Sequence, residues 1–413
     1  MLRGLRSVAL RRERAAAEHI PYTAHVADAV VKTAAGDYLQ AFRLGGASFE
    51  SADDEQLNNW HERLNVLWRN VASPHLALWT HLIRRPERAV PRVTSGCGFA
   101  DRLTARYRER LAGETLMVNE LYIAVCYRPA VGLAGGMVAK VLGRAGAAPP
   151  GADLLDALDN CAKLAQTLRA ALARYEPESL GVYRCGGTWC SSLLEYLASL
   201  INGEWRRMPL PVGPLDAALA TTRLLFGNEA IEYRMPAATR VGAMLGIKEY
   251  PTPSVVGMYN RLLSAPFPLV LTQSFTFLSR ASGQALLQRQ YFRLLNAGDF
   301  AVSQAAQLRE ALDGLTSNDF VMGDHHFSLQ VLADLEEPRG GDEGLWRLKS
   351  LNDHVALARN LLADTGMTVA REDLALEAAF WAQLPCNFAM RPRKAPITSR
   401  NLAAMVPFHN YPI

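Results

Sequence analysis

The sequence predicts an α+β protein built as two mixed α/β lobes, with largely antiparallel or mixed sheets and long helices. Its 413 residues exceed what one ordinary hydrophobic core accommodates, so we expect more than one lobe. With 49% hydrophobic and 20% charged residues, the composition is typical of a globular protein. Short β-prone runs alternate with longer stretches whose apolar residues recur at helical spacing, and this alternation predicts the mixed class.

The first lobe is expected at residues 20–128. Two β-prone runs joined by Thr-Ala-Ala-Gly predict a hairpin, and Ser-Ala-Asp-Asp at 51–54 spells a capping box that starts a helix. Apolar residues then recur at helical spacing at Leu57, Trp60, Leu64, Leu67 and Val71. The expected elements are strands at 25–32 and 37–44, the helix from about 51, a strand at 75–84, a basic amphipathic helix at 102–111 and a strand at 116–127.

A composition shift separates this lobe from the next. Residues 129–151 are dominated by Gly, Ala and Pro, which predicts a connection. The second lobe is expected at residues 152–389. Its expected helices lie at 152–175, 191–201, 278–315, 345–362 and 373–384, with a short one ending at 264. Its expected strands lie at 180–184, 240–250, 267–277, 320–335 and 367–370, with a hairpin at 224–234.

Charge and cysteine content narrow the function classes. A formal net charge of +4 does not indicate a nucleic-acid-binding protein. The six cysteines are scattered in apolar surroundings and no secretory signal precedes them, so we expect reduced core thiols in the cytoplasm. The sequence contains no run of 18 apolar residues, so it predicts no membrane-spanning helix. The basic segment 1–19 fits either a solvated helix end or a short amphipathic helix on an anionic membrane surface.

The common catalytic motifs are absent from the sequence. It has no G-x-x-x-x-G-K-[ST], no G-x-S-x-G, no H-E-x-x-H and no G-x-G-x-x-G after a strand. Gly132, Gly135 and Gly136 precede Lys140, but Val141 stands where a phosphate-binding loop needs Ser or Thr.

Isolated candidates for chemistry also have simpler explanations. Cys185 and Cys190 lack two further zinc ligands at comparable spacing. His325 and His326 are neighbours on a predicted strand, where adjacent side chains point to opposite faces. The acidic residues at 53–55 suit a helix N-terminus. We therefore assign no catalytic, cofactor-binding or metal-binding residue.

Several short motifs, weak one by one, are specific as an ordered set. They are IPY at 20–22, SFESADD at 48–54, LWTH at 78–81, RR at 84–85, YRP at 127–129, GAMLGIKEYP at 242–251, APF at 265–267, LTQSFTF at 271–277, NF at 387–388, RPR at 391–393, PITSRN at 396–401 and PFHNYP at 407–412. In this order they resemble the N-terminal region of the CagE/TrbE/VirB family, the large cytoplasmic ATPases of type IV secretion and conjugation. The resemblance runs from about Ile20 to the last residue.

The resemblance implies the scaffold and docking region of a type IV secretion system ATPase, which powers substrate translocation or pilus assembly. It implies a peripheral location on the cytoplasmic face of the bacterial inner membrane. The implied partners are inner-membrane components of the machine, including a small membrane protein, other secretion ATPases, and further copies of the chain in a hexamer. Family members continue into a RecA-like ATPase domain, where ATP and Mg²⁺ are expected. The alternative is a free-standing adaptor that hydrolyses nothing.

The last segment, 390–413, is expected to be an extended connector toward that absent ATPase domain, because prolines interrupt it. Its apolar run at 402–406 needs a surface to cover. Four basic residues invite a nucleic-acid interpretation, although solvated linker residues or ion-pair partners are commoner. These residues are Arg391, Arg393, Lys394 and Arg400.

Overall fold

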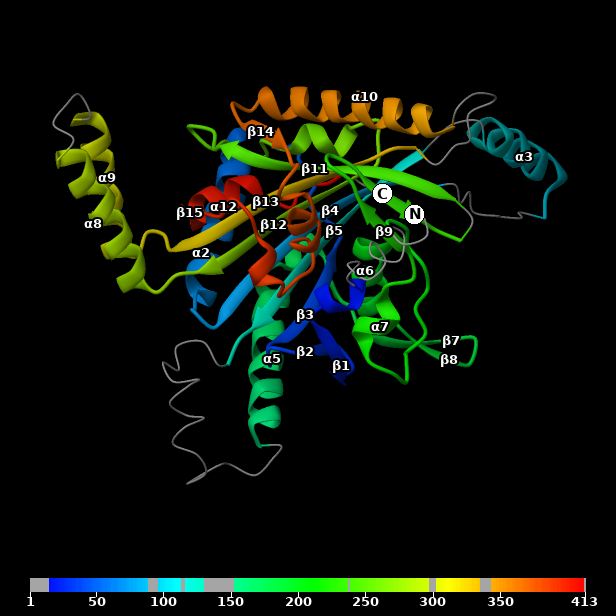
Figure 1. Ribbon diagram of the computed structural model, residues 1–413, viewed down its shortest axis with the longest axis horizontal. Helices are drawn as coiled ribbons and strands as arrows, with labels where there is room; N and C mark the ends of the chain where they lie inside the picture. The colour runs from blue at the N-terminus through cyan, green and yellow to red at the C-terminus, as the bar shows by residue number, and fades with distance from the viewer. Residues whose placement is uncertain are drawn as a thin grey trace, which may run out of the picture.

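The computed structural model describes residues 15–87, 96–112, 116–129, 152–236, 238–296, 302–334 and 343–411. In this part of the chain one thirteen-stranded sheet runs through the molecule, and helices cover both of its faces (Figure 1). Its strand pairs are antiparallel. The fold is therefore α+β, as the sequence predicts.

The centre of the sheet consists of two units with the same order of elements. The first is β3 (Tyr38–Leu44), α2 (Asp54–Val71), β4 (Leu76–Glu87), β5 (Leu116–Tyr127), α5 (Ala152–Ala171) and β6 (Pro177–Ser179). The second is β11 (Thr239–Glu249), η3 (Asn260–Ser264), β12 (Leu269–Phe277), β13 (Met322–Leu332), α10 (Glu343–Ala363) and β14 (Thr368–Arg371). In both, the first strand lies between the third and the fourth, which is the split βαβ arrangement.

The two units join through their second strands, β4 and β12, along a line that we call the seam. Leu82 lies opposite Leu271 across this line, and His81 lies opposite Thr272. Because the pairing is antiparallel, the two units are related by an approximate twofold rotation. The lobes expected at 20–128 and 152–389 both contribute strands to this one sheet.

Two short strands extend the sheet beyond each unit. They are β1 (Tyr22–Ala27) and β2 (Val30–Thr33) on one side, and β10 (Ile231–Arg234) and β9 (Arg223–Phe226) on the other. The hairpin predicted at 224–234 is confirmed. The single strand predicted at 25–32 is wrong, because the chain turns after Ala27 and Asp28 O accepts a hydrogen bond from Val182 N.

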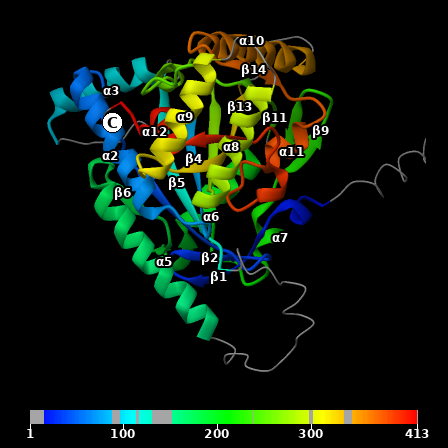
Figure 2. The same ribbon diagram turned by 90° about the vertical axis from the view of Figure 1, so that its left-hand side faces the viewer.

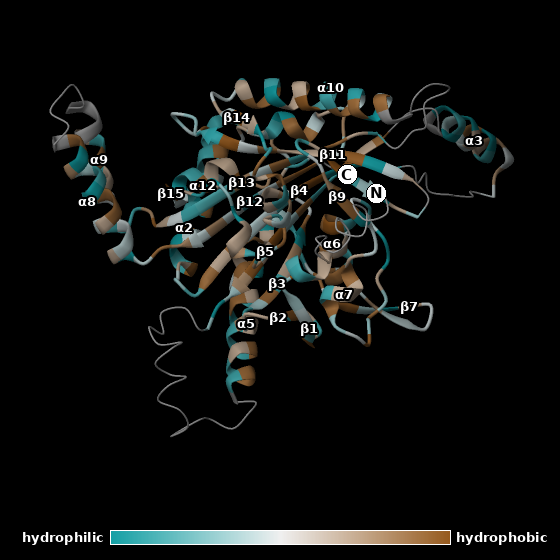
Figure 3. Cartoon of the chain, viewed as in Figure 1, coloured by the Kyte–Doolittle hydropathy of each residue, from teal (hydrophilic) through white to brown (hydrophobic). Residues whose placement is uncertain are grey.

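Alternating strand residues build a core on each face of the sheet. On one face Leu78, Leu82 and Leu271 pack with the helices of the two units. On the other, Trp79, Ile83 and Val270 pack with α6 (Ser192–Asn202), α7 (Leu215–Leu219) and α11 (Leu376–Trp381). Figure 3 shows the central strands as largely hydrophobic, as a sheet covered on both faces requires.

Each unit carries a helical insertion between its second and third strands. The first has α3 (Gly98–Ala112), and the second has α8 (Arg280–Asn296) and α9 (Val302–Thr316). The insertions lie at opposite ends of the sheet in Figure 1, and Figure 2 shows α8 and α9 side by side. The helical character predicted at 278–315 is confirmed, and it is divided between these two helices, in which Leu287 of α8 shares a small core with Leu315 of α9.

The remaining elements are short. They are β7 (Val182–Cys185), β8 (Thr188–Ser191), η1 (Ala16–His19), η2 (Ala173–Tyr175) and η4 (Phe388–Met390). The capping box predicted at 51–54 is replaced by a simpler cap, in which Asp53 Oδ1 accepts from Gln56 N at 2.8 Å. No helix among the described residues is both long and apolar enough to cross a bilayer. The start of the basic segment (1–14) and Lys140 lie outside the described residues.

The end of the chain differs from the expected extended connector. It forms β15 (Ala395–Thr398), which pairs with β13, and α12 (Ser399–Met405), which packs on α2. Pro392 and Pro396 both precede α12, so neither interrupts a helix.

Candidate functional site

The residues that follow α11 bind both units, and we call residues 386–411 the C-terminal clip. The clip starts on the sheet face covered by α6 and α11. It then forms β15, which pairs with residues 322–325 of β13. β11 pairs with residues 328–332 of the same strand. The clip ends on the opposite face, in the core that contains α2. The clip therefore wraps around the sheet close to the seam.

The Arg391 side chain of the clip reaches the seam. Its guanidinium carbon lies 5.6 Å from the ring centre of Trp79 and 5.2 Å from that of Phe388. Its Nη1 donates to Thr276 Oγ1 at 2.9 Å. Burial leaves Arg391 only 8% exposed and lowers its pKa to about 10. Because Trp79 belongs to β4 and Thr276 to β12, one cation contacts both units.

The next residues bind the second unit alone. Arg393 Nε donates to Oε1 of Glu372 at 2.7 Å, and Glu372 is fully buried directly after β14. His326 Nδ1 donates to Pro392 O at 2.7 Å. The hydrogen bond to Glu372 raises the pKa of Arg393, whereas burial lowers the pKa of His326 to about 4. Arg393 is therefore charged and His326 neutral near pH 7.

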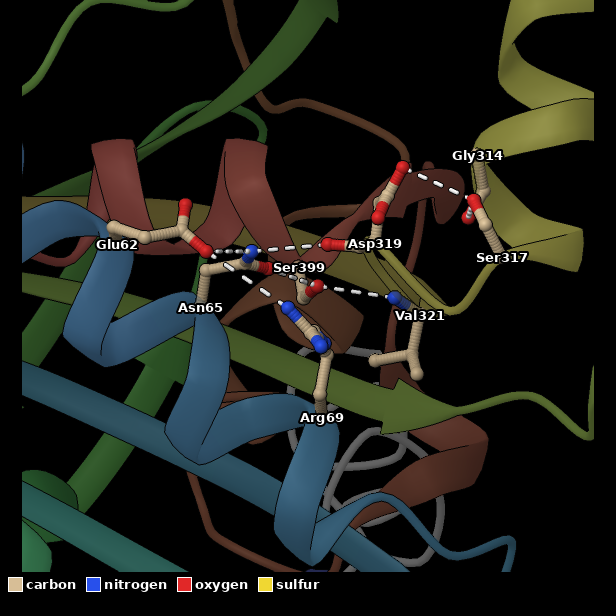
Figure 4. Close-up of polar contacts among 8 residues, drawn as sticks. All are labelled: Glu62, Asn65, Arg69, Gly314, Ser317, Asp319, Val321 and Ser399. Atoms are coloured by element: carbon tan, nitrogen blue, oxygen red, sulfur yellow. Dashed lines mark hydrogen bonds and ion pairs between the residues drawn. The ribbon is translucent and has the colours of Figure 1, made fainter.

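Ser399 connects the clip to the first unit and to the foot of the α8–α9 hairpin. Its hydroxyl donates to Asn65 Oδ1 at 2.7 Å and accepts from Val321 N at 3.1 Å (Figure 4). Asn65 Nδ2 in turn donates to Asp319 O at 3.1 Å. Ser399 and Asn65 are both fully buried. Their polar atoms thus have partners, as burial requires, and three distant segments meet in one network.

α12 continues this contact along α2. A capping box starts the helix, with Thr398 Oγ1 accepting from Asn401 N and Asn401 Oδ1 accepting from Thr398 N. Arg400 lies over the Phe320 ring at 5.9 Å. Leu402 packs in the same core as Leu64 and Leu67 of α2. The apolar run at 402–406 is therefore covered by the two units themselves.

The clip ends by touching both units again. The backbone of Ala47 makes two hydrogen bonds with the residues on either side of His409. The His409 ring stacks on Phe49 with 5.0 Å between ring centres. On the other side, Asn260 Nδ2, at the start of η3, donates to His409 Nδ1 at 3.0 Å. Burial lowers the pKa of His409 to about 4, so the ring is neutral near pH 7.

We call the C-terminal clip, together with the residues of the two units that it contacts, the joint. Arg391, Arg393, Arg400, His326 and His409 contact carboxylate, carbonyl, amide, hydroxyl or aromatic partners on the two units or in the clip. Among the residues that the structure describes, no group of three or more His, Cys, Asp and Glu could hold a metal ion. The arrangement can fix the position of one unit, and of the segment that leaves it, relative to the other.

The structure also locates the residues singled out from the sequence. His325 and His326 lie on opposite faces as predicted, with His325 Nδ1 accepting from Tyr250 OH at 2.9 Å. Of the basic residues in the clip, only Lys394 is exposed without a contact described above. Cys97 is exposed, which corrects the expectation of a core thiol, because it precedes the projecting helix α3. Four other cysteines are buried as expected: Cys126, Cys161, Cys190 and Cys386.

The sequence does not predict the roles of two residues of the joint. Asn65 is a polar residue between Leu64 and Leu67 on the apolar side of a predicted helix, and that mismatch was a usable signal. Glu372 follows a short strand, and nothing in the local sequence indicates that its carboxylate is buried.

Two family models match the chain. The model of the CagE, TrbE, VirB family, component of type IV transporter system, matches residues 178–393. The model of the type IV secretion system ATPase VirB4/TrbE, N-terminal domain, matches residues 29–134. The chain belongs to the CagE/TrbE/VirB family.

Curated relatives from several bacteria align along almost the whole chain. Type IV secretion system protein virB4 of Bartonella quintana is 38% identical over 98% of the chain and 50% of its own length. PtlC of Bordetella pertussis is 35% identical over 97% of the chain and 48% of its own length. Protein virB4 of Agrobacterium tumefaciens is 35% identical over 97% of the chain and 49% of its own length. The chain spans about half the length of these relatives.

The CagE/TrbE/VirB match covers the second unit and only the first part of the C-terminal clip. The model that ends at residue 393 contains the second unit and the two arginines of the clip that bind the sheet, Arg391 and Arg393. Residues 395–411 lie beyond both family models, whereas the curated relatives cover 97–98% of the chain. The joint is therefore made partly from a segment that the family models omit.

Proposed function

We propose that this chain is the scaffold and docking region of a type IV secretion system ATPase that powers substrate translocation or pilus assembly. The observation that carries the proposal is the C-terminal clip, which binds both units and the seam between them. A segment held in this way fixes the position of any residues joined to it relative to the whole sheet. Because the chain belongs to a family of type IV transporter components, the joint would operate within a type IV secretion system.

We place nucleotide chemistry outside these residues. The matched relatives are about twice as long as the aligned region, which leaves room for a separate ATPase domain. ATP and Mg²⁺ would bind in that domain. The present residues would position the motor and transmit its movements through the clip.

The proposed location is peripheral, on the cytoplasmic face of the bacterial inner membrane. The proposed partners are inner-membrane components of the secretion machine, including a small membrane protein, together with other secretion ATPases. Further copies of the chain would join it in a hexamer. Arg391, Arg393 and Arg400 already have partners within the fold, which argues against nucleic acid as a partner of the clip.

Affinity purification from a bacterium that carries the secretion machine tests this function. The tagged chain is expected to retain inner-membrane components of the machine, and the purified chain is expected to lack ATP hydrolysis. The double variant Asn65→Ala/Ser399→Ala should retain fewer components, whereas Asn58→Ala, at an exposed asparagine on the same helix, should behave like the unaltered chain. Hydrolysis by the purified chain, or retention of no component, would contradict the proposal.

A free-standing adaptor is the second candidate, because the described fold forms a complete sheet with both faces covered. The reading frame separates the two candidates. A frame that continues after Ile413 into a G-x-x-x-x-G-K-[ST] motif supports the ATPase, and a stop codon there supports the adaptor.

A further inference from the structure

Helix α3 has its apolar side turned away from the protein. Phe99, Leu103 and Tyr107 are 70%, 60% and 61% exposed, although they recur at a spacing of four residues. Among residues 98–110 of the same helix, whose side chains the structure describes, the half-buried positions are Ala100, Asp101, Thr104 and Arg108. A surface helix of a globular protein normally shows the reverse orientation. The exposed stripe is therefore not explained by the core of this chain.

Three exposed arginines lie beside this stripe: Arg102, Arg106 and Arg110. At about 100° per residue, the three apolar residues and the three arginines together occupy an arc of about 140°. Asp101 lies on the half-buried side, and Glu109 lies at the edge of the arc. The outward side of α3 thus combines aromatic and aliphatic groups with positive charge.

The position of α3 leaves this side accessible. The helix projects beyond the end of the sheet, at the right of Figure 1, as an insertion between β4 and β5. Its 15 residues correspond to a length of about 22 Å. A single projecting helix presents a convex surface, which can lie flat on an extended partner.

We propose that α3 is an interfacial helix that lies on an anionic lipid bilayer. Phe99, Leu103 and Tyr107 would enter the boundary between headgroups and acyl chains, and the arginines would bind lipid phosphates. Amphipathic helices with arginine on one side and large apolar groups beside it bind membranes in this way. This inference rests on the peripheral location proposed above and assigns the lipid contact to one element.

The combination of charges favours lipid over a protein groove. Each outward apolar residue has an arginine within one turn, so burying the stripe in a protein would also require burial or pairing of three cations. An anionic bilayer accepts both groups at once, because phosphates lie directly above the apolar layer.

Vesicle sedimentation with the full chain tests the inference. The chain is expected to bind phosphatidylcholine vesicles containing phosphatidylglycerol and to bind pure phosphatidylcholine weakly. The triple variant Arg102→Gln/Arg106→Gln/Arg110→Gln should bind anionic vesicles about 100-fold more weakly. Raising the ionic strength from about 0.1 M to about 1 M should also weaken binding, because the screening length falls from about 10 Å to about 3 Å.

A matched control separates α3 from general charge. Arg289→Gln/Arg293→Gln/Arg309→Gln removes the same charge from exposed positions of α8 and α9 and should leave vesicle binding nearly unchanged. Equal losses in the two triple variants would overturn the assignment to α3. So would a Phe99→Ser/Leu103→Ser/Tyr107→Ser variant that keeps the unaltered melting temperature and full vesicle binding.

The exposed thiol of Cys97, one residue before α3, allows contact with lipid to be measured at this helix. An environment-sensitive fluorophore on Cys97, in a Cys185→Ser background, should shift its emission to the blue with anionic vesicles. Vesicle binding without this shift would move the lipid contact elsewhere and leave the peripheral location intact. If the chain fractionates with membranes only in cells that contain the secretion machine, and purified chain ignores vesicles, a protein partner replaces lipid.

Discussion

The Ser399 hydroxyl donates a 2.7 Å hydrogen bond to Oδ1 of Asn65, a residue 334 positions earlier in the chain. This contact joins the C-terminal clip to α2 of the first unit. Asn65 also donates to Asp319 O, so its loss would remove one hydrogen bond from each of two other segments.

Removal of the Asn65 amide should therefore destabilise the fold. We expect Asn65→Ala to lower the free energy of unfolding by about 1–3 kcal/mol, the usual cost of leaving buried polar groups unpaired. Urea denaturation measures this change. Asn58→Ala removes an exposed asparagine from the same helix and should change stability by less than about 0.5 kcal/mol. Additive effects of Asn65→Ala and Ser399→Ala would show that the two side chains are not coupled.

Breaking the ion pair of Arg393 should cost more than replacing its buried partner. Arg393→Met leaves the fully buried Glu372 carboxylate without its cation, and we expect a loss of about 2–3 kcal/mol. Glu372→Gln keeps the shape and removes the charge, so its loss should be smaller. Thermal or urea unfolding of the two variants, beside Arg359→Met at an exposed position of α10, gives the comparison. A smaller loss for Arg393→Met than for Glu372→Gln would contradict this order.

Stability should fall on mild acidification. Burial lowers the pKa of His326 and His409 to about 4 in the folded protein, whereas the unfolded chain titrates near its usual value of about 6.5. Between these values the unfolded state binds the proton and the folded state does not. The stabilisation is therefore complete above pH 6.5 and is lost as the pH falls toward 4, by about 1.4 kcal/mol per pH unit for each histidine.

Unfolding free energies measured from pH 7 to pH 5 test this dependence. His409→Gln should reduce the slope of the unfolding free energy against pH by the contribution of about one proton, because glutamine does not titrate. A His61→Gln variant, at a histidine of α2, provides the comparison. Curves of equal slope for His409→Gln and the unaltered chain would show that His409 does not contribute.

Gly323 should tolerate no side chain. It lies on β13 between Phe277 and Ile397 of the neighbouring strands, and an added Cβ would come within 2.4 Å of the buried Phe275 ring and 2.7 Å of Thr276 O. We expect Gly323→Ala to cost about 1–3 kcal/mol through displacement of this ring. Gly98→Ala, where a Cβ meets nothing within 4 Å, should not destabilise the protein. Equal melting temperatures of the two variants would contradict the crowding.

The sequence predicts most of the elements because each strand and helix has its own period. The helix at 54–71 and the strand at 116–127 follow directly from apolar spacing. Pairing between distant strands has no such local sign. Nothing near Leu82 or Leu271 indicates that these two residues face each other, so the seam and the repeated unit appear only in three dimensions.

The differences between the expected and the observed elements have the same kind of physical cause. The stretch at 278–315 contains two helices, α8 and α9, and the residues of both favour a helix, so the local sequence does not show that they are separate. The sequence of the C-terminal clip predicts an extended connector because prolines and basic residues are common in linkers. Its true partners, Trp79, Glu372 and Asn65, are supplied by three other segments.

The clip also constrains the order of events during biosynthesis. Residues 395–411 leave the ribosome after every strand of both units, yet they cover β13 and part of the core beside the seam. At about 5–20 residues per second, the 62 residues between Leu332 and Ala395 take about 3–12 s to synthesise, so β13 exists before that cover arrives. Until then the edge of β13 and the apolar groups beneath α12 are exposed to other nascent chains. Completion of this fold is thus a late event, and a chaperone that shields β13 would have its effect in that interval.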